Sequence, residues 1–159
     1  MSSIEGGTEA RFGGRWRAGV LQYGKPYDRQ VNTQAAARAW IDAWDRAWRS
    51  LDVEPLGAVY AADAVFRSHP FRESQSPLDY ARGAFAEEEG DPELWWGDPV
   101  AVGDRAVVEW WAVVVENGEV TSLAGVSLLR FRSDARVIEQ HDYWGSTSGR
   151  ALPWEGWGT

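Results

Sequence analysis

Hydrophobic and polar positions follow a β-strand pattern along the last third of the chain, where three β-rich runs succeed one another. The first run, residues 106–116, is dense in Val and Trp and stops at an Asn-Gly pair, a strong signal for a tight hairpin turn. The second run spans residues 120–132, and a Ser-Asp-Ala turn leads into the third, residues 136–144. Three consecutive antiparallel strands form a meander, and a meander needs another layer that covers one of its faces.

The first half of the chain predicts a helix that carries a stripe of tryptophans. Thr33 can cap a helix over residues 34–51. Trp40, Trp44 and Trp48 recur at positions i, i+4 and i+8, so the three indoles share one face of this helix. Such a stripe is typical of a helix that packs in a core. Because each buried indole N–H needs a hydrogen-bond partner, three in one stripe also indicate a roomy interior that can hold a ligand.

The segment between these two regions predicts two more helices and two strands, separated by proline and turn residues. In chain order we expect a helix over residues 52–60, a strand over 65–68, a helix over 78–89 and a strand over 93–102. The three glutamates at 87–89 are expected to form a solvated acidic end of the last of these helices. The complete order of elements predicts an α+β fold whose helices cover one face of the sheet.

Composition narrows the class of protein. The 159 residues suit one domain, and 44% hydrophobic with 25% charged residues is typical of a globular protein. The net charge of −8 argues against nucleic acid as a partner, because phosphates require clustered basic residues. No apolar run is long enough to span a bilayer, and the N-terminus lacks the apolar segment of a secretory signal, so we expect a cytoplasmic protein without a membrane partner.

Motifs for metals and cofactors are missing from the sequence. The chain has no cysteine, which excludes disulfides, a thiolate nucleophile and cysteine-based metal sites. It also has no glycine-rich phosphate loop, no metal-binding His/Glu spacing and no Gly-x-Ser-x-Gly motif. We therefore expect neither a cofactor nor a metal ion.

Four features together resemble the SnoaL-like branch of the nuclear transport factor 2-like (NTF2-like) superfamily. They are the tryptophan stripe, the segment YAADAVF, the proline-initiated third helix and the ending GVSLLRFRSDARVIEQHDYW. The resemblance covers residues 33–144, which leaves an N-terminal extension at 1–32 and a C-terminal tail at 145–159. It implies an NTF2-like α+β cone, in which a curved, mostly antiparallel sheet wraps on three N-terminal helices, with a pocket at its open end. It also implies a homodimer that packs through the outer sheet face.

Strand alternation, combined with the geometry of that cone, sorts the side chains of the meander by face. Gln140, Asp142 and Trp144 of the last strand should point into the cone, whereas Trp111 and Tyr143 should lie outside and are candidates for a dimer interface. The side chains that we expect to bind a ligand are Trp40, Trp44, Trp48, Tyr60, Phe66, Trp110, Ser127, Gln140 and Trp144.

Asp142 and His69 are the candidate catalytic residues. A carboxyl group among indoles has its pKa raised by desolvation, which brings Asp142 toward the range useful for general acid–base catalysis. The alternative for Asp142 is a structural carboxylate bonded to an indole N–H or an arginine. Ketosteroid isomerases of the superfamily carry an aspartate base where this chain has Ser68 and His69. The resemblance therefore implies that His69 replaces that base as a neutral imidazole, and the alternative is an ordinary loop histidine.

Two classes of function remain open at this point. Relatives in the superfamily include ketosteroid isomerases, polyketide cyclases, scytalone dehydratase and limonene epoxide hydrolase, but also non-catalytic domains, so the fold does not fix the function. The resemblance favours a cofactor-independent acid–base enzyme, of cyclase, isomerase or dehydratase type, on a small apolar molecule of aromatic or polyketide-like character. The alternative is a non-catalytic ligand-binding or dimerisation domain. An enzyme should present Asp142 to a ligand, whereas a binding module would bury it in an ion pair.

Both ends of the chain contain aromatic residues, which loose tails rarely need. Residues 1–32 contain Trp16, Tyr23 and Tyr27, and they form either a flexible tail or an arm over the pocket mouth or across a dimer. Near the other end, residues 153–157 read Pro-Trp-Glu-Gly-Trp. We predict that this segment folds back onto the domain or onto its dimer partner.

Overall fold

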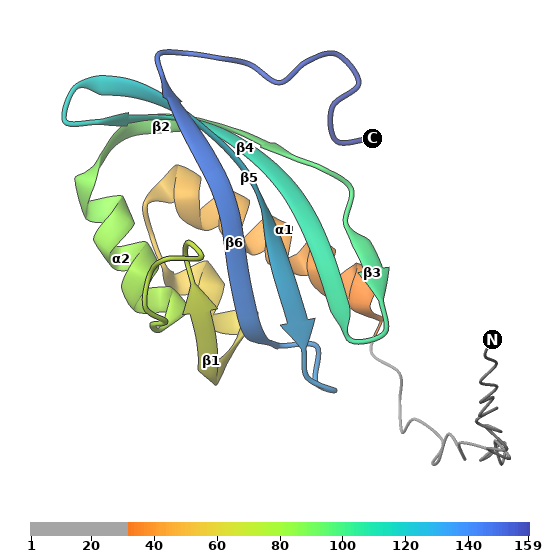
Figure 1. The fold of residues 1–159 in the computed structure, drawn as a ribbon. Coiled ribbons are helices and arrows are strands. Elements are labelled where there is room, and N and C mark those ends of the chain that lie inside the picture. The colour runs from red at the N-terminus through yellow and green to blue at the C-terminus, as the bar shows by residue number, and fades with distance from the viewer. Residues whose placement is uncertain (1–31) are drawn as a thin grey trace, which may run out of the picture.

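The computed structural model describes residues 32–159, so the predicted arm or tail at residues 1–32 lies outside the described residues except for Asn32. The described part consists of two α-helices, one 3-10 helix and a six-stranded sheet (Figure 1). In chain order the elements are α1 (Thr33–Ser50), η1 (Glu54–Ala58), β1 (Tyr60–Arg67), α2 (Pro77–Glu87), β2 (Glu88–Trp96), β3 (Val100–Val102), β4 (Arg105–Glu116), β5 (Glu119–Phe131) and β6 (Val137–Ser148). No helix of this described part is long and apolar enough to cross a membrane.

The sheet has the strand order β1-β6-β5-β4-β2, and β3 pairs with β4 beside this path. All of these pairings are antiparallel except that of β1 with β6. The predicted meander is confirmed as β4, β5 and β6. Asn117 and Gly118 join β4 to β5 with φ angles of 51° and 76°, the positive values that a tight hairpin turn requires. Figure 1 shows the sheet curving around α1.

The expectation of three N-terminal helices is confirmed for two α-helices, whereas the short second helix is a 3-10 helix. The segment expected to form a helix over 52–60 contains only the five-residue 3-10 helix η1. The backbone is extended in β1 from Tyr60 onward, which ends the helical segment. The observed architecture is thus a mixed, curved sheet with two α-helices, an α+β arrangement consistent with an NTF2-like cone.

Helix α1 forms the centre of the core. The Asn32 side chain accepts a hydrogen bond from the Ala35 backbone N–H at 3.0 Å, so Asn32 and not Thr33 caps the helix. The helix ends at Leu51, which adopts a left-handed conformation with φ 51°. Small and aromatic side chains of one α1 face are buried against the concave side of the sheet, namely Ala36, Ala37, Trp40, Ala43, Trp44 and Ala47.

The C-terminal segment folds back onto the outer face of the sheet, as predicted. The ring of Trp111 on β4 lies 6.1 Å from that of Trp154 and 6.3 Å from that of Trp157. Trp111 Nε1 also donates a hydrogen bond to the Ala151 carbonyl oxygen at 2.9 Å. Trp111, expected as part of a dimer interface, is therefore covered by the chain's own tail, while Tyr143 stays 47% exposed.

Candidate functional site

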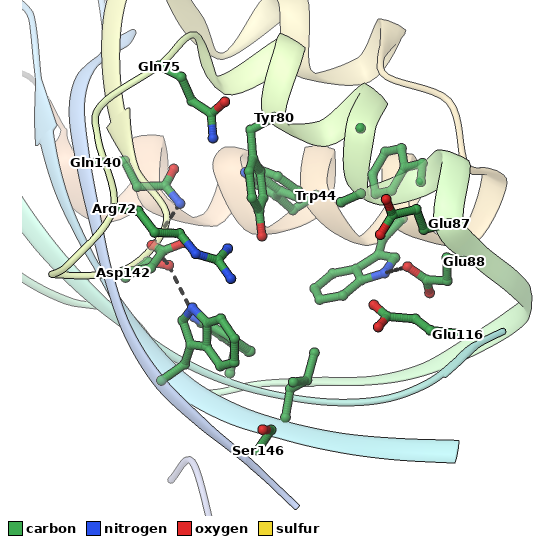
Figure 2. A pocket seen from close by; sticks show the side chains of 18 of the residues that line it. Trp44, Arg72, Gln75, Tyr80, Glu87, Glu88, Glu116, Gln140, Asp142 and Ser146 are labelled. Atoms are coloured by element: carbon green, nitrogen blue, oxygen red, sulfur yellow. Dashed lines mark hydrogen bonds between the residues drawn. The ribbon is translucent and has the colours of Figure 1, made fainter. Parts of the chain in front are cut away.

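A cavity of about 540 Å³ lies between the helices and the concave face of the sheet (Figure 2). Most of the residues predicted to bind a ligand line it, namely Trp40, Trp44, Trp48, Trp110, Ser127, Gln140 and Trp144, together with the candidate catalytic Asp142. Inward alternation along β4, β5 and β6 and the helical stripe of α1 bring these side chains together. Several further lining residues were not predicted from the sequence, among them Arg72, Gln75, Tyr80, Glu88 and Glu116.

Three predicted site residues lie outside the cavity lining. Tyr60 is 3% exposed and bonds to Gln140 from behind. Phe66 is fully buried, and its ring packs edge-on against that of Tyr80 with 4.7 Å between centroids. His69 sits on the loop after β1, where its half-buried ring lies 5.5 Å from the ring of Trp144.

Asp142 on β6 lines the cavity and accepts hydrogen bonds from the described residues through only one of its two carboxylate oxygens. Ser127 Oγ donates a hydrogen bond to Asp142 Oδ1 at 2.7 Å, and Gln140 Nε2 donates to the same oxygen at 2.9 Å. Across residues 32–159, no side chain donates to Oδ2, and no basic group forms an ion pair with this carboxylate. Within the described residues, Asp142 is therefore not a structural carboxylate paired with an arginine.

Burial raises the pKa of Asp142 from its ordinary 3.8 to about 7, because desolvation disfavours the charged form. The hydrogen bonds from Gln140 and Ser127 act in the opposite direction and lower the pKa in part. A carboxyl with a pKa near 7 exists in both protonation states at neutral pH. It can therefore accept and return a proton, which is what general acid–base catalysis requires.

A chain of buried hydrogen bonds orients Gln140, one of the two residues that donate to Asp142. The Tyr60 hydroxyl donates to Gln140 Oε1 and itself accepts from Trp40 Nε1 at 2.8 Å and Trp44 Nε1 at 2.7 Å. Because Oε1 of the amide is taken by Tyr60, the amide must direct its Nε2 donor at Asp142. Desolvation raises the pKa of Tyr60 above its ordinary value, so its hydroxyl keeps the proton that it donates.

Trp110 of β4 orients the hydroxyl group of Ser127 in a similar way. Trp110 Nε1 donates to Ser127 Oγ at 3.1 Å, which leaves the serine hydroxyl proton for Asp142. The indole N–H groups of Trp40, Trp44 and Trp110 therefore orient polar side chains. This satisfies the requirement that buried indoles find hydrogen-bond partners.

Arg72 is the only basic side chain among the described residues that line the cavity. Its guanidinium carbon lies 5.6 Å from the centroid of the Trp144 ring, within range of a cation–π interaction. Figure 2 shows its side chain directed into the cavity. Arg72 is exposed, and its Nη1 donates a hydrogen bond to Ser68 Oγ at 3.4 Å. The ion pairs formed within residues 32–159 do not include Arg72, so no carboxylate of this part of the chain neutralises its charge.

Glu88 corrects the expectation of a solvated acidic helix end. Helix α2 ends at Glu87, and the backbone is extended from Glu88, so the alternation of β2 turns Glu88 inward and Glu89 outward. Glu88 is 9% exposed, and its Oε2 accepts a hydrogen bond from Trp48 Nε1 at 2.6 Å. Desolvation raises the pKa of Glu88 to about 7, opposed by the Trp48 bond and reinforced by the charge of Glu116.

Comparison with known proteins identifies the family. The sequence model of the SnoaL-like domain matches residues 37–140, so the chain belongs to the SnoaL-like domain family, and the predicted resemblance is confirmed. A comparison with curated proteins finds no match.

Solved structures with the same fold include several proteins of low sequence identity. SalBIII, described as an epoxide hydrolase/cyclase-like enzyme in pyran ring formation in polyether salinomycin, superposes with a TM-score of 0.61 at 12% identity, over 72% of this chain and 93% of that one. AclR from Streptomyces galilaeus superposes with a TM-score of 0.58 at 18% sequence identity, and the match covers 71% of this chain and 90% of AclR. An LEH-like epoxide hydrolase from M. tuberculosis superposes with a TM-score of 0.56 at 16% sequence identity, and the match covers 69% of this chain and 82% of the hydrolase. These similarities show a shared fold.

Proposed function

We propose that this protein is a cofactor-independent acid–base enzyme that acts on a small, largely apolar organic molecule bound in the cavity. The observation that carries the proposal is the Asp142 carboxyl, which lines the cavity with Oδ2 unbonded by the described residues and a pKa of about 7. Six indoles in the lining suit an apolar or aromatic substrate. The similarity in fold to SalBIII and to an epoxide hydrolase supports an enzyme of this superfamily.

The chemistry begins with proton transfer to the free oxygen of Asp142. Ionised Asp142 accepts a proton from a carbon next to a carbonyl group. The electron pair of the broken C–H bond forms a C=C bond with the carbonyl carbon, and the π electrons of the carbonyl move onto its oxygen. The guanidinium of Arg72 stabilises the negative charge on that oxygen. Protonated Asp142 then returns the proton to another carbon in an isomerisation or to a leaving hydroxyl in a dehydration. In a cyclisation, the enolate carbon attacks a second carbonyl carbon, whose oxygen takes the proton.

His69 is the second proposed participant. Its ring contacts Trp144, which lines the cavity, while the histidine itself is half-buried on the loop after β1. We propose that it assists Asp142 from beside Trp144, without lining the cavity itself.

We also propose that residues 33–144 are the functional domain and that two copies pair through the outer sheet face in the cytoplasm. Leu128 and Tyr143 on that face are 40% and 47% exposed, which supports an apolar contact there.

Deuterium exchange into an enolisable aromatic ketone tests the acid–base proposal. In deuterated buffer, NMR should show that the protein accelerates exchange of the C1 protons of 2-tetralone, and Asp142→Asn should lower this acceleration by about 10²–10⁴-fold. Asp79→Asn is the matched control, because Asp79 also lines the cavity but is exposed and paired with Arg82. Its rate should equal that of the wild type.

The other outcomes separate the two candidate functions. An Asp142→Asn variant that exchanges at the wild-type rate would show that this carboxyl is not the base. Saturable binding of 2-tetralone without any protein-dependent exchange would favour the non-catalytic ligand-binding domain.

A further inference from the structure

The end of the cavity remote from Asp142 is formed by carboxyl groups. Figure 2 shows Glu87, Glu88 and Glu116 together on one side, with Asp142 and Arg72 on the other. The lining residues of the described chain place no basic side chain among these three glutamates. The cavity therefore has one end lined by three carboxyl groups, with Glu88 buried and Glu87 and Glu116 exposed, and an end where a single arginine stands beside the acid–base group.

Two of these glutamates oppose each other directly. Glu88 of β2 and Glu116 of β4 are cross-strand partners at the start of the antiparallel ladder. Like charges in directly opposite positions destabilise a sheet. A pair of this kind at a cavity wall is stabilised when a positive group sits next to both carboxylates.

Glu88 also has an unmatched hydrogen-bond acceptor. The side chain is 9% exposed, and while Oε2 accepts the Trp48 N–H, Oε1 is buried and has no hydrogen-bond partner within the described chain. Buried polar atoms are normally bonded, and an unmatched one costs free energy. The described residues therefore supply no hydrogen-bond donor for Oε1 of this carboxyl group.

Aromatic rings stand beside the glutamates. The Trp48 ring lies 6.3 Å from that of Trp44 and 6.4 Å from that of Trp110, and Trp44 lies 6.4 Å from Phe85. Aromatic faces attract organic cations, and carboxylates add ionic hydrogen bonds to an N–H donor. Aromatic rings combined with carboxylates are the environment that an organic ammonium group prefers.

We propose that Glu88, with Glu116, binds the protonated amine of the substrate. The inference rests on the proposed function, because it takes the cavity to be the substrate site. The substrate is then an apolar molecule with a basic amine at the end remote from the atoms on which Asp142 acts. The ammonium N–H groups supply the donor that Glu88 lacks, and Arg72 repels the ammonium from the opposite end, so the molecule enters in one orientation.

Calorimetric titration with two isosteric ligands tests this site. The ligands are 2-naphthylmethylammonium and the neutral 2-naphthylmethanol, which differ in the charged group alone. The wild type should bind the ammonium roughly tenfold or more tightly, since close opposite charges attract strongly in a partly desolvated site. Glu88→Gln should abolish most of this preference while keeping an acceptor for Trp48. Glu89→Gln removes the same charge from the adjacent, outward-facing position and should keep the preference.

Each contrary result has a distinct meaning. Equal binding of the two ligands by the wild type, or an unchanged preference in Glu88→Gln, would overturn the amine site and leave the acid–base proposal standing. Binding of neither ligand would overturn both. If Glu88→Gln does not fold, as judged by thermal melting, Glu116→Gln supplies the test and should also reduce the preference. Asp142→Asn should retain the preference, because that carboxyl lies at the other end.

Discussion

The Asp142 carboxyl owes its chemical character to neutral neighbours. Ser127 and Gln140 each donate one hydrogen bond to the same oxygen, and neither carries a charge that would fix the carboxylate form. A guanidinium in their place would hold the pKa low and make the group a permanent anion. Hydroxyl and amide donors position the group and leave burial as the larger influence on its pKa.

The raised pKa of Asp142 predicts how stability depends on pH. The pKa is 3.8 in its ordinary state and about 7 in the folded protein, so the folded state retains a proton that the unfolded chain releases between these values. The carboxyl's effect on stability therefore becomes less favourable as pH rises from about 4 to about 7, by up to roughly 4 kcal/mol. Asparagine does not titrate, so melting curves of Asp142→Asn and wild type should diverge across this window, with the variant the more stable at pH 7.

The exposed Asp79 supplies the control for that measurement, because Asp79→Asn should follow the wild-type melting profile. Parallel profiles of Asp142→Asn and wild type from pH 4 to 8 would show that Asp142 ionises in the folded protein as it does in the unfolded chain.

At the scale of elements, one glycine determines how the strands present two indoles to the cavity. Gly125 on β5 lies opposite Trp110 of β4 and Trp144 of β6 in the two ladders. A methyl group at Gly125 would lie 2.5 Å from Trp144 Cβ and 2.5 Å from the Tyr143 carbonyl oxygen. These distances are too short for ordinary contact, so the backbone or both indoles would have to move.

Gly125→Ala should therefore destabilise the protein by about 1–3 kcal/mol or more, as overpacking does, and weaken ligand binding through the displaced indoles. Gly145→Ala is the matched control on β6, where an added methyl group meets no atom within 4 Å. Denaturant titration and ligand titration of both variants provide the measurements. A Gly125→Ala variant as stable as Gly145→Ala would mean that the two indoles are not packed around this glycine.

Much of the site follows from sequence periodicity because most of its residues lie on regular elements. The β4–β5 ladder is regular, and the register shift of the β5–β6 ladder lies between Arg130 and Phe131, beyond the site. A two-residue period therefore suffices to place Ser127 and Gln140 on the inner face. The spacing of the α1 tryptophans likewise identifies their common face.

Residues outside such elements could not be placed in this way. Arg72 lies on an irregular loop after β1, where no period relates its position to a face. Glu88 stands at the change from α2 to β2 within a run of three glutamates, and its orientation depends on the residue at which the helix ends. Its opposition to Glu116 arises from strand pairing across distant parts of the chain, which composition does not reveal. The position at which η1 gives way to β1 likewise depends on strand pairing, because β1 pairs with β6 from a distant part of the chain.

At the scale of the whole molecule, the two faces of the sheet have different roles. The concave face holds the cavity, whereas the convex face is partly covered by the C-terminal segment. Arg150 bonds both carboxylate oxygens of Glu93 at 2.6 Å, and the Asp98 backbone N–H donates to the Gly158 carbonyl oxygen at 3.0 Å. The segment is therefore attached at several points along β2 and β4, and it shields the part of the outer face around Trp111.

Removal of the residues after Gly149 tests the importance of this attachment. The truncated chain loses both aromatic contacts of Trp111 and the bond from its indole to Ala151. Aromatic pairs contribute about 0.5–1.5 kcal/mol each beyond the burial of area, so the melting temperature should fall by several degrees. Tryptophan emission should shift to longer wavelength as Trp111 becomes exposed to water. Sedimentation should show whether the uncovered outer face pairs with a second copy, since an exposed apolar patch promotes association. An unchanged melting temperature together with an unchanged emission maximum would show that the segment does not pack against Trp111 in solution.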